Sequence, residues 1–443
     1  MKRRSTLFDV LTTLSTRAIG MAAGFAISVL TARLLGPEGK GLLAAITVIP
    51  GIILSLADLG IRQSTAHFVG KKSYPLETIA SSLIMIWMFT TLISVGLASI
   101  SYRVQFGTEH WWLIAIVLIT IPFNLATNYL SGLLQGKQRI LNLNLLELGR
   151  PMLNIVLIVG LVYVLRLDVA GMLIASLLVS VYNVGLAFYI ASKDVRFRLQ
   201  KQTLDIPTKI MSKGIMYAVA LFVLQLNYRV DLVMIDWMAT TYDVGIYSLA
   251  TGVAELIWQI PAAIGMVLFA RSSNSRTDSD AVQRTSRMIR VLLPIMLLLG
   301  GLMWIIMPEF VRIVYGTPYL PSIPVIRLLL PGVIVMFIVK LIHTDVAARG
   351  NPLFGMWLAI GPLLINIAMN LVMIPLYGVN GAAITTTVSY TIASVLFLLA
   401  YARKERVSLR KILLIERADV AEMMSRLRLN PQLRSSEKRK GAY

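Results

Sequence analysis

Long apolar stretches separated by short polar segments run along the whole chain. The stretches are rich in Leu, Ile, Val, Ala and Met. Apolar and polar residues do not alternate within them, whereas they would alternate in the strands of a membrane barrel. A helix needs about 20 apolar residues to cross the hydrocarbon core of a bilayer. The pattern predicts twelve membrane-spanning helices, over 8–33, 41–69, 77–102, 112–134, 147–165, 169–192, 212–238, 243–270, 288–307, 324–348, 353–375 and 379–402.

The longest uncharged stretch lies near the C-terminus. From Gly350 to Ala402 the sequence contains no Asp, Glu, Lys or Arg. This stretch is too long for one span, and the segment Pro375–Gly381 has the composition of a tight turn. We therefore expect two helices here, joined between 375 and 381.

Composition agrees with an all-α integral membrane protein. Hydrophobic residues make up 57% of the chain and charged residues only 14%, against about 25% charged residues in a soluble domain. The net charge is +20, but the basic residues gather at the N-terminus, in the even-numbered connections and in the C-terminal tail. Because basic residues favour the cytoplasmic side, this distribution predicts that both termini are cytoplasmic, and it explains the charge without nucleic acid.

An internal repeat relates the two halves of the chain. The segment Leu35–Ala45 follows the first predicted span, and Met238–Ala250 follows the seventh; each is a polar turn, then a glycine, then small residues. Six spans separate the two segments, so the halves have the same orientation, as in transporters built from parallel repeats. We expect a six-helix lobe over 1–192, a basic cytoplasmic linker over 193–213, a second six-helix lobe over 214–403 and a basic cytoplasmic tail over 404–443.

The tail carries an apolar stripe at helical spacing. Leu413, Val420, Met424 and Leu427 share this stripe, and arginines flank it. Such a helix could lie on the anionic inner leaflet, or the tail could be a solvated segment with a frayed helix.

No motif of an enzyme is present in the sequence. The chain has no Walker loop, no H-E-x-x-H zinc motif and no cysteine, and its three histidines are isolated. We therefore predict a protein that is not an enzyme, requires no cofactor or metal, and draws on an ion or substrate gradient for any transport.

Charged residues inside the predicted spans are the candidate functional residues. A charge at the bilayer centre costs about 2.5–3.5 kcal/mol on insertion scales, so it usually faces a partner or a wet cavity. Cations at several depths could line a path for an anionic headgroup, and Glu255 is the candidate for ion coupling by a titrating carboxylate. The candidate cavity residues are Arg17, Asp58, Arg62, Arg229, Asp231 and Lys340.

Structural explanations remain open for these charges. Asp58 and Arg62 are four residues apart on one predicted helix and could simply neutralise each other. Arg17, Arg229 and Glu255 have no partner on their own helix, so a cavity role and a pairing between helices are both possible.

Several motifs resemble the polysaccharide-transporter family of lipid-linked oligosaccharide flippases. They are Leu35–Gly41, Ala57–Ile61, Leu133–Arg139, Leu226–Ile235, Val244–Ala250 and Ile260–Ile264. The resemblance implies two six-helix bundles in a V, as in the multidrug/oligosaccharidyl-lipid/polysaccharide exporter superfamily. It also implies a cationic cavity and a cargo of undecaprenyl-pyrophosphate-linked oligosaccharide, flipped to the outer leaflet of the bacterial cytoplasmic membrane for O-antigen, capsule or exopolysaccharide synthesis. Membrane lipid, a polysaccharide polymerase and a chain-length regulator are the further partners it suggests.

Other functions remain as alternatives. A multidrug or small-cation antiporter of the same superfamily would want an acidic cavity, whereas cations here are at least as numerous as carboxylates. A membrane glycan polymerase or ligase usually has a large extracytoplasmic loop, and the longest candidate here is 308–323. A scaffold without transport would leave the charges inside the spans unexplained.

Overall fold

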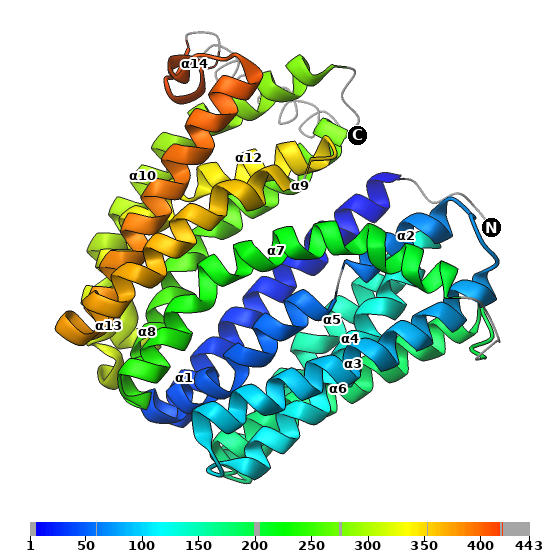
Figure 1. The fold of residues 1–443 in the computed structure, drawn as a ribbon. Coiled ribbons are helices and arrows are strands. Elements are labelled where there is room, and N and C mark those ends of the chain that lie inside the picture. The colour runs from blue at the N-terminus through cyan, green and yellow to red at the C-terminus, as the bar shows by residue number, and fades with distance from the viewer. Residues whose placement is uncertain are drawn as a thin grey trace, which may run out of the picture.

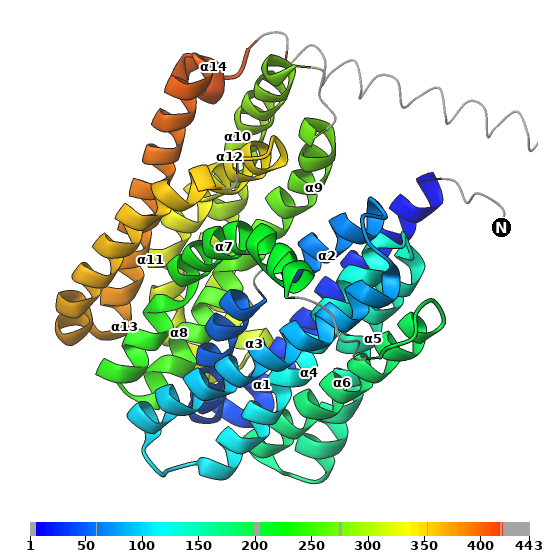
Figure 2. The same ribbon diagram turned by 45° about the vertical axis from the view of Figure 1, so that its right-hand side comes forward.

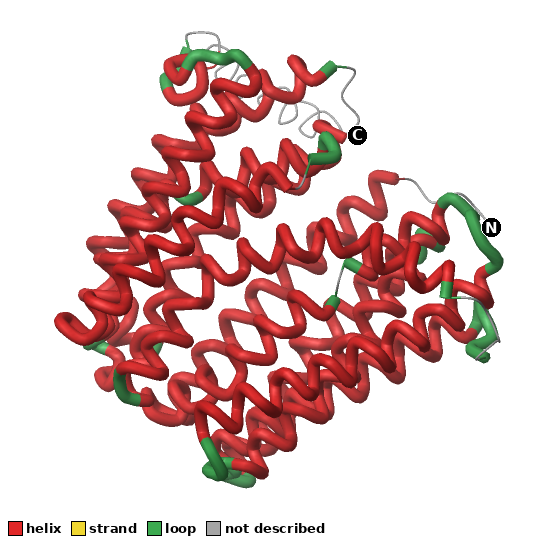
Figure 3. The backbone as a smooth tube through the Cα atoms, viewed as in Figure 1, coloured by secondary structure: helices red, strands yellow, loops and turns green. Residues whose placement is uncertain are grey.

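The computed structural model describes residues 6–58, 60–198, 204–273, 277–351, 353–416 and 419. Within these ranges the chain is helical almost throughout and has no strand (Figure 3). The helices form two bundles in a V (Figures 1 and 2). Large apolar side chains such as Leu92 and Ile305 are about three-quarters exposed on the outside of the bundles, where a membrane protein meets lipid.

The N-terminal lobe contains the first six spans. Its helices are α1 (Thr6–Ala57), α2 (Ile61–Gly70), α3 (Leu76–Phe106), α4 (Trp111–Gly136), α5 (Ile140–Ile158) with a π-helical extension η1 (Val159–Val164), and α6 (Asp168–Ser192). The long apolar segments form these helices, and turns at the connections end them. The helices lie in the order of the predicted spans.

The C-terminal lobe repeats the arrangement. Its helices are α7 (Asp205–Met238), α8 (Thr241–Ala254), the short η2 (Glu255–Trp258), α9 (Gln259–Ser273), α10 (Asp278–Val314), η3 (Thr317–Tyr319), α11 (Ser322–Val335), α12 (Phe337–Ala348), α13 (Leu353–Glu405) and α14 (Leu409–Leu413). Helix α7 packs against α13 and α8, and also against α1, α2 and α3 of the other lobe.

Two of the helices are bent into hairpins by glycine. Eight described helical segments are long and apolar enough to cross a membrane, among them 15–70, which runs through α1 and α2, and 353–405. A straight helix of 53 residues would extend about 80 Å, more than twice the roughly 30 Å hydrocarbon core. Gly36 and Gly378 interrupt these helices with positive φ values of 66° and 56°, and the second glycine confirms the break expected between 375 and 381. Counting both halves of each bent helix, and adding α7 and the path α8–η2–α9, gives the twelve predicted spans.

One predicted span is interrupted. The apolar pattern predicts a continuous helix over 41–69 that places Asp58 and Arg62 on one face. That prediction is wrong, because α1 ends at Ala57 and α2 begins at Ile61, after Gly60 in the left-handed conformation with φ 58°. Glycine adopts this conformation without steric cost and breaks the helical register between the two charges.

The lobes meet at one end of the V through equivalent segments of the repeat. This end holds the bend of α1 and the start of α8, whereas the lobes lie apart at the end with α14 and the start of α1 (Figures 1 and 2). A Cβ on Gly41 would lie 1.8 Å from the carbonyl oxygen of Thr241, and a Cβ on Gly245 would lie 1.9 Å from that of Pro37. Only glycine allows two backbones to approach this closely.

Polar and aromatic contacts close the same end of the V. The Nε of Arg33 donates to the carbonyl of Val314 at 2.7 Å, and its second guanidinium nitrogen donates to the carbonyl of Ile313. The hydroxyl of Tyr319 donates to the carbonyl of Ala32 at 3.1 Å. These bonds join α1 to the end of α10 and to η3, across the two lobes.

Candidate functional site

An ion pair between two helices forms the centre of the candidate site. Arg229 extends from α7, and Glu255 begins η2 directly after α8. The Arg229 Nη2 lies 3.5 Å from the Glu255 Oε2, with the side chains 35% and 20% exposed. The structure therefore brings together two charges that had no partner on their own helices.

A second cation lies beside this pair, against aromatic rings. The Lys340 Nζ on α12 is 3.8 Å from the centroid of the Trp258 ring and 4.5 Å from that of the Tyr228 ring. It also lies 3.4 Å from the Tyr228 hydroxyl. An ammonium group is attracted to the electron-rich ring faces by up to about 2 kcal/mol when desolvated. The rings therefore hold the charge inside the bundle instead of letting it extend to the membrane surface.

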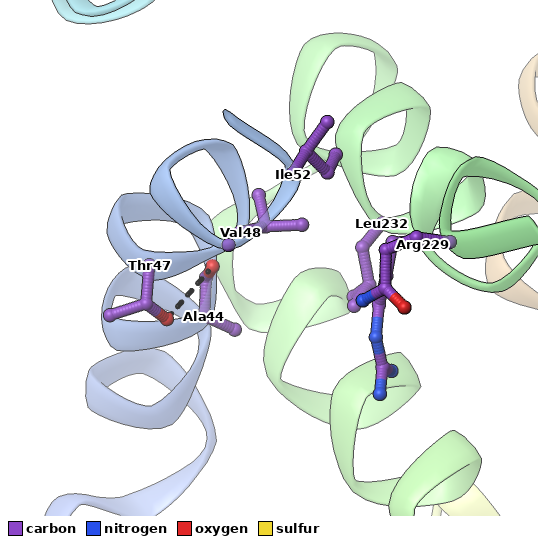
Figure 4. Close-up of a pocket in the computed structure, with 8 residues that line it drawn as sticks. Ala44, Thr47, Val48, Ile52, Arg229 and Leu232 are labelled. Carbon is purple, nitrogen blue, oxygen red and sulfur yellow. Dashed lines mark hydrogen bonds between the residues drawn. The ribbon is translucent and has the colours of Figure 1, made fainter. Parts of the chain in front are cut away.

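A cavity of about 220 Å³ lies between α1 and α7, next to Arg229. Figure 4 shows Thr47, Val48 and Ile52 on one side of it and Arg229 with Leu232 on the other. The full lining is Ala44, Thr47, Val48, Gly51, Ile52, Gln225, Arg229 and Leu232. Apart from Arg229, Gln225 and Thr47, these side chains are apolar or absent, so the guanidinium is the one formal charge in the lining.

Asp231 is enclosed within the C-terminal lobe. The residue is 2% exposed, and its carboxylate accepts hydrogen bonds from Thr386 at 2.6 Å, Asn370 at 2.9 Å and Tyr247 at 3.1 Å. These donors come from α8 and α13 and satisfy a charge that would be costly to bury alone. The structure places Asp231 in a fixed polar network, and not in the lining of the cavity beside Arg229.

The predicted residues of the N-terminal lobe do not form one cluster. Arg62 lies 3.7 Å from the Glu147 Oε1 on α5 and donates to the Gln135 Oε1 at 3.3 Å, instead of pairing with Asp58. The Asp58 Oδ1 is buried without a hydrogen-bond partner among the described residues. Arg17, on the first half of α1, is exposed.

The cluster of Arg229, Lys340 and Glu255 has one net positive charge. Two cationic groups of different geometry, a planar guanidinium and a compact ammonium, flank a single carboxylate. This set can hold an anion, since a guanidinium offers a bidentate fork to phosphate or carboxylate oxygens.

Residues 7–276 match the family model described as "Polysaccharide biosynthesis protein". This match covers more than half of the chain. The chain belongs to the polysaccharide biosynthesis protein family. Arg229 and Glu255 both lie inside the matched segment, and Lys340 lies beyond it.

A curated relative of this polysaccharide biosynthesis protein comes from Haloferax volcanii. It is named "Probable flippase AglR" and is 30% identical over 173 residues, which is 38% of this chain and 36% of the relative. The match thus spans about a third of the length of that protein.

Two solved structures share the fold of this polysaccharide biosynthesis protein. One is an inward-facing conformation of a multidrug resistance MATE family transporter of the MOP superfamily, with a TM-score of 0.72, 15% identity, and coverage of 90% of this chain and 99% of that one. The other is the lipid II flippase MurJ in an inward closed conformation, with a TM-score of 0.70, 17% identity, and coverage of 92% and 89%. They confirm the two-bundle fold that the resemblance implied.

Sequence reasoning missed the aromatic residues of the site. Tyr228 directly precedes the predicted charge Arg229, and Trp258 follows Glu255 by three residues, but both could equally have been ordinary core or interface residues. A signal was available in retrospect, because an aromatic ring next to a charge inside a predicted span is a ready partner for a cation.

Proposed function

We propose that this protein is a flippase that moves undecaprenyl-pyrophosphate-linked oligosaccharide repeat units from the cytoplasmic to the outer leaflet of the bacterial cytoplasmic membrane. The movement would follow alternating access and serve O-antigen, capsule or exopolysaccharide synthesis. Membership of the polysaccharide biosynthesis family supports this proposal. The name of the archaeal relative and the fold shared with a lipid II flippase point in the same direction.

The observation that carries the proposal is the cationic cluster beside the cavity between α1 and α7. A pyrophosphate is the most highly charged part of such a cargo, and it needs cations to enter a membrane-embedded site. Arg229 and Lys340 would share its oxygens, while Glu255 limits the net charge so that the anion can leave again. The apolar lining around Arg229 would exclude water from the contact and strengthen it.

The open end of the V would be the loading side. The lobes lie apart at the end that holds α14 and the start of α1 (Figure 1). The distribution of basic residues predicts that this end is cytoplasmic, with both termini inside. The contacts of Arg33 and Tyr319 close the opposite end. The conformation would therefore accept a cargo from the cytoplasmic leaflet, and the outer contacts must break for its release.

A multidrug or cation antiporter is the second candidate function. Its supporting observation is Glu255, a largely buried carboxylate that could bind a proton or a cation. However, Arg229 already pairs with Glu255, and Lys340 adds a second positive charge. A cationic substrate would have to displace these groups, so an anionic cargo is favoured.

A deletion strain tests the proposal in the cell. Loss of the gene should trap lipid-linked repeat units on the cytoplasmic face and remove the surface polysaccharide. The native gene should restore the polysaccharide, and an Arg229→Gln variant made at equal protein level should not. Normal surface polysaccharide in the deletion strain would reject the flippase assignment.

A further inference from the structure

A second polar cavity lies inside the N-terminal lobe, apart from the cluster around Arg229. It has a volume of about 100 Å³ and is lined by residues of α2, α4, α5 and α6. Its lining combines charged, amide and hydroxyl side chains: Arg62, Asn124, Thr127, Asn128, Ser131, Leu143, Leu146, Glu147, Arg150 and Asn183. A polar pocket of this kind inside a membrane bundle is costly, so it calls for a functional explanation.

The inner wall of this cavity carries an unsatisfied acceptor. Asn183 on α6 is 4% exposed, and its Oδ1 has no hydrogen-bond partner among the described residues. Nearby, the Asn124 Oδ1 accepts from the Ser180 hydroxyl at 3.3 Å. Leaving a buried acceptor without a partner costs about 1–3 kcal/mol, which a ligand that donates a hydrogen bond would recover.

The outer part of the cavity is charged and accessible. Arg62 and Glu147 are 34% and 46% exposed and lie 3.7 Å apart, and Arg150 is exposed. Two guanidinium groups and one carboxylate thus line the same cavity. The close packing of α2 on α4 fixes the backbone of Arg62, since a Cβ on Gly132 would be only 2.6 Å from the Arg62 carbonyl oxygen.

We infer that this cavity is a binding subsite for a sugar residue that carries an acidic group. Hydroxyl groups of the sugar would donate to Asn183 and exchange hydrogen bonds with Asn128 and Ser131. The acidic group would accept from Arg150 and Arg62, and Glu147 would accept from a further hydroxyl. A simple anion would bind the guanidinium groups but could not donate a hydrogen bond to the Asn183 Oδ1. An anion that also carries hydroxyl groups would satisfy both parts of the lining.

This subsite deepens the proposed function, because it rests on a glycan being the cargo. All four of its helices belong to one lobe. The subsite would therefore keep its shape while the lobes rock, and it would hold the glycan while the pyrophosphate contacts the cluster of the other lobe. A subsite for an acidic sugar would let this protein distinguish between lipid-linked glycans, which the pyrophosphate common to them cannot do.

Binding of free sugars to the full chain in lipid nanodiscs tests the subsite. The probes are glucuronic acid, glucose and inorganic pyrophosphate, titrated against the wild type and three variants. Glucuronic acid should bind the wild type more tightly than glucose does. Asn183→Leu and Arg150→Gln should each weaken the binding of glucuronic acid at least tenfold. Each variant removes a hydrogen bond to the sugar and leaves the sugar's own hydrogen-bonding group without a partner. Arg229→Gln should weaken pyrophosphate and leave glucuronic acid unchanged.

Each contrary result overturns the subsite. The inference fails if glucuronic acid does not bind the wild type, or if Arg229→Gln weakens it as much as Asn183→Leu does. It also fails if the wild type binds glucose as tightly as glucuronic acid, or if Arg150→Gln binds glucuronic acid as tightly as the wild type does. Arg150 is exposed, so this variant remains informative if Asn183→Leu does not fold. Sugar binding without flipping would reject the proposed function and retain the subsite, and flipping without sugar binding would do the reverse.

Discussion

Gly41 on α1 and Gly245 on α8 pack against each other reciprocally across the two lobes. Each glycine faces the carbonyl oxygen that occupies the equivalent place in the other half, Thr241 for Gly41 and Pro37 for Gly245. Both glycines belong to the repeated segments that the sequence relates. This close contact joins the two lobes at the closed end of the V, and we expect it to act as the pivot when the lobes rock.

A methyl group at this pivot should disturb the join between the lobes. Gly245→Ala would place a Cβ 1.9 Å from the Pro37 carbonyl oxygen, so α1 and α8 must separate. Overpacking of this kind costs about 1–3 kcal/mol, and we expect a lower midpoint of thermal unfolding. Gly252 on the same helix has open space around its Cβ position, so Gly252→Ala is the matched control and should be neutral or slightly stabilising. Equal midpoints for the two variants would refute the pivot.

Removal of the Arg33 contact should favour opening at the closed end of the V. Its guanidinium bonds to the last carbonyls of α10, where a cation also complements the helix dipole. The natural chain has no cysteine, so a single Thr47→Cys change gives one labelling site in the cavity. Arg33→Gln should raise its labelling by an impermeant maleimide from outside several-fold. Arg312 is an exposed arginine at the same end, so Arg312→Gln is the control and should leave the labelling unchanged. Equal labelling in the two variants would show that the Arg33 contact does not keep this end closed.

Loss of the Glu255 carboxylate should separate binding from coupling. Glu255→Gln leaves Arg229 and Lys340 without a counter-charge, so the cluster gains one positive charge. We expect inorganic pyrophosphate to bind several-fold more tightly, while transport loses its response to an imposed pH gradient. Titration in nanodiscs and transport at fixed and graded pH measure the two effects. An unchanged pH response would remove Glu255 from ion coupling.

The start of the tail is fixed to α10 by ion pairs to the buried Arg290. Arg290 lies 3.0 Å from carboxylate oxygens of both Glu416 and Asp419, and it donates to the carbonyl of Lys411 at 2.5 Å. Breaking a buried pair by removing one partner costs about 3–5 kcal/mol. Arg290→Gln should therefore lower the midpoint of thermal unfolding by several degrees, and a midpoint equal to that of the wild type would show that the tail contributes nothing. Val420, Met424 and Leu427 of the predicted apolar stripe lie outside the described residues.

The fold was largely predictable, because hydrophobic length and basic loops are local signals. The turn between 375 and 381 appeared in the sequence as a proline and glycines and is formed at Gly378. The pairing of Arg229 with Glu255 could not be predicted, since it depends on how α7 and η2 rotate against each other. The separation of Asp58 from Arg62 had a visible signal, the glycine at position 60, but a continuous apolar pattern concealed the break.

Flipping in proteoliposomes tests most directly whether Arg229 and its neighbours carry a lipid-linked anion across the bilayer. The wild type, Arg229→Gln and, as a control, Arg103→Gln at an exposed arginine of α3 would be reconstituted with a fluorescent polyprenyl-pyrophosphate-linked oligosaccharide. A membrane-impermeant quencher would report the fraction of label in the outer leaflet over time. We predict that the wild type and Arg103→Gln equilibrate the label and that Arg229→Gln does so at least tenfold more slowly. A wild type that moves no label, or an Arg229→Gln variant as fast as the wild type, would contradict the account.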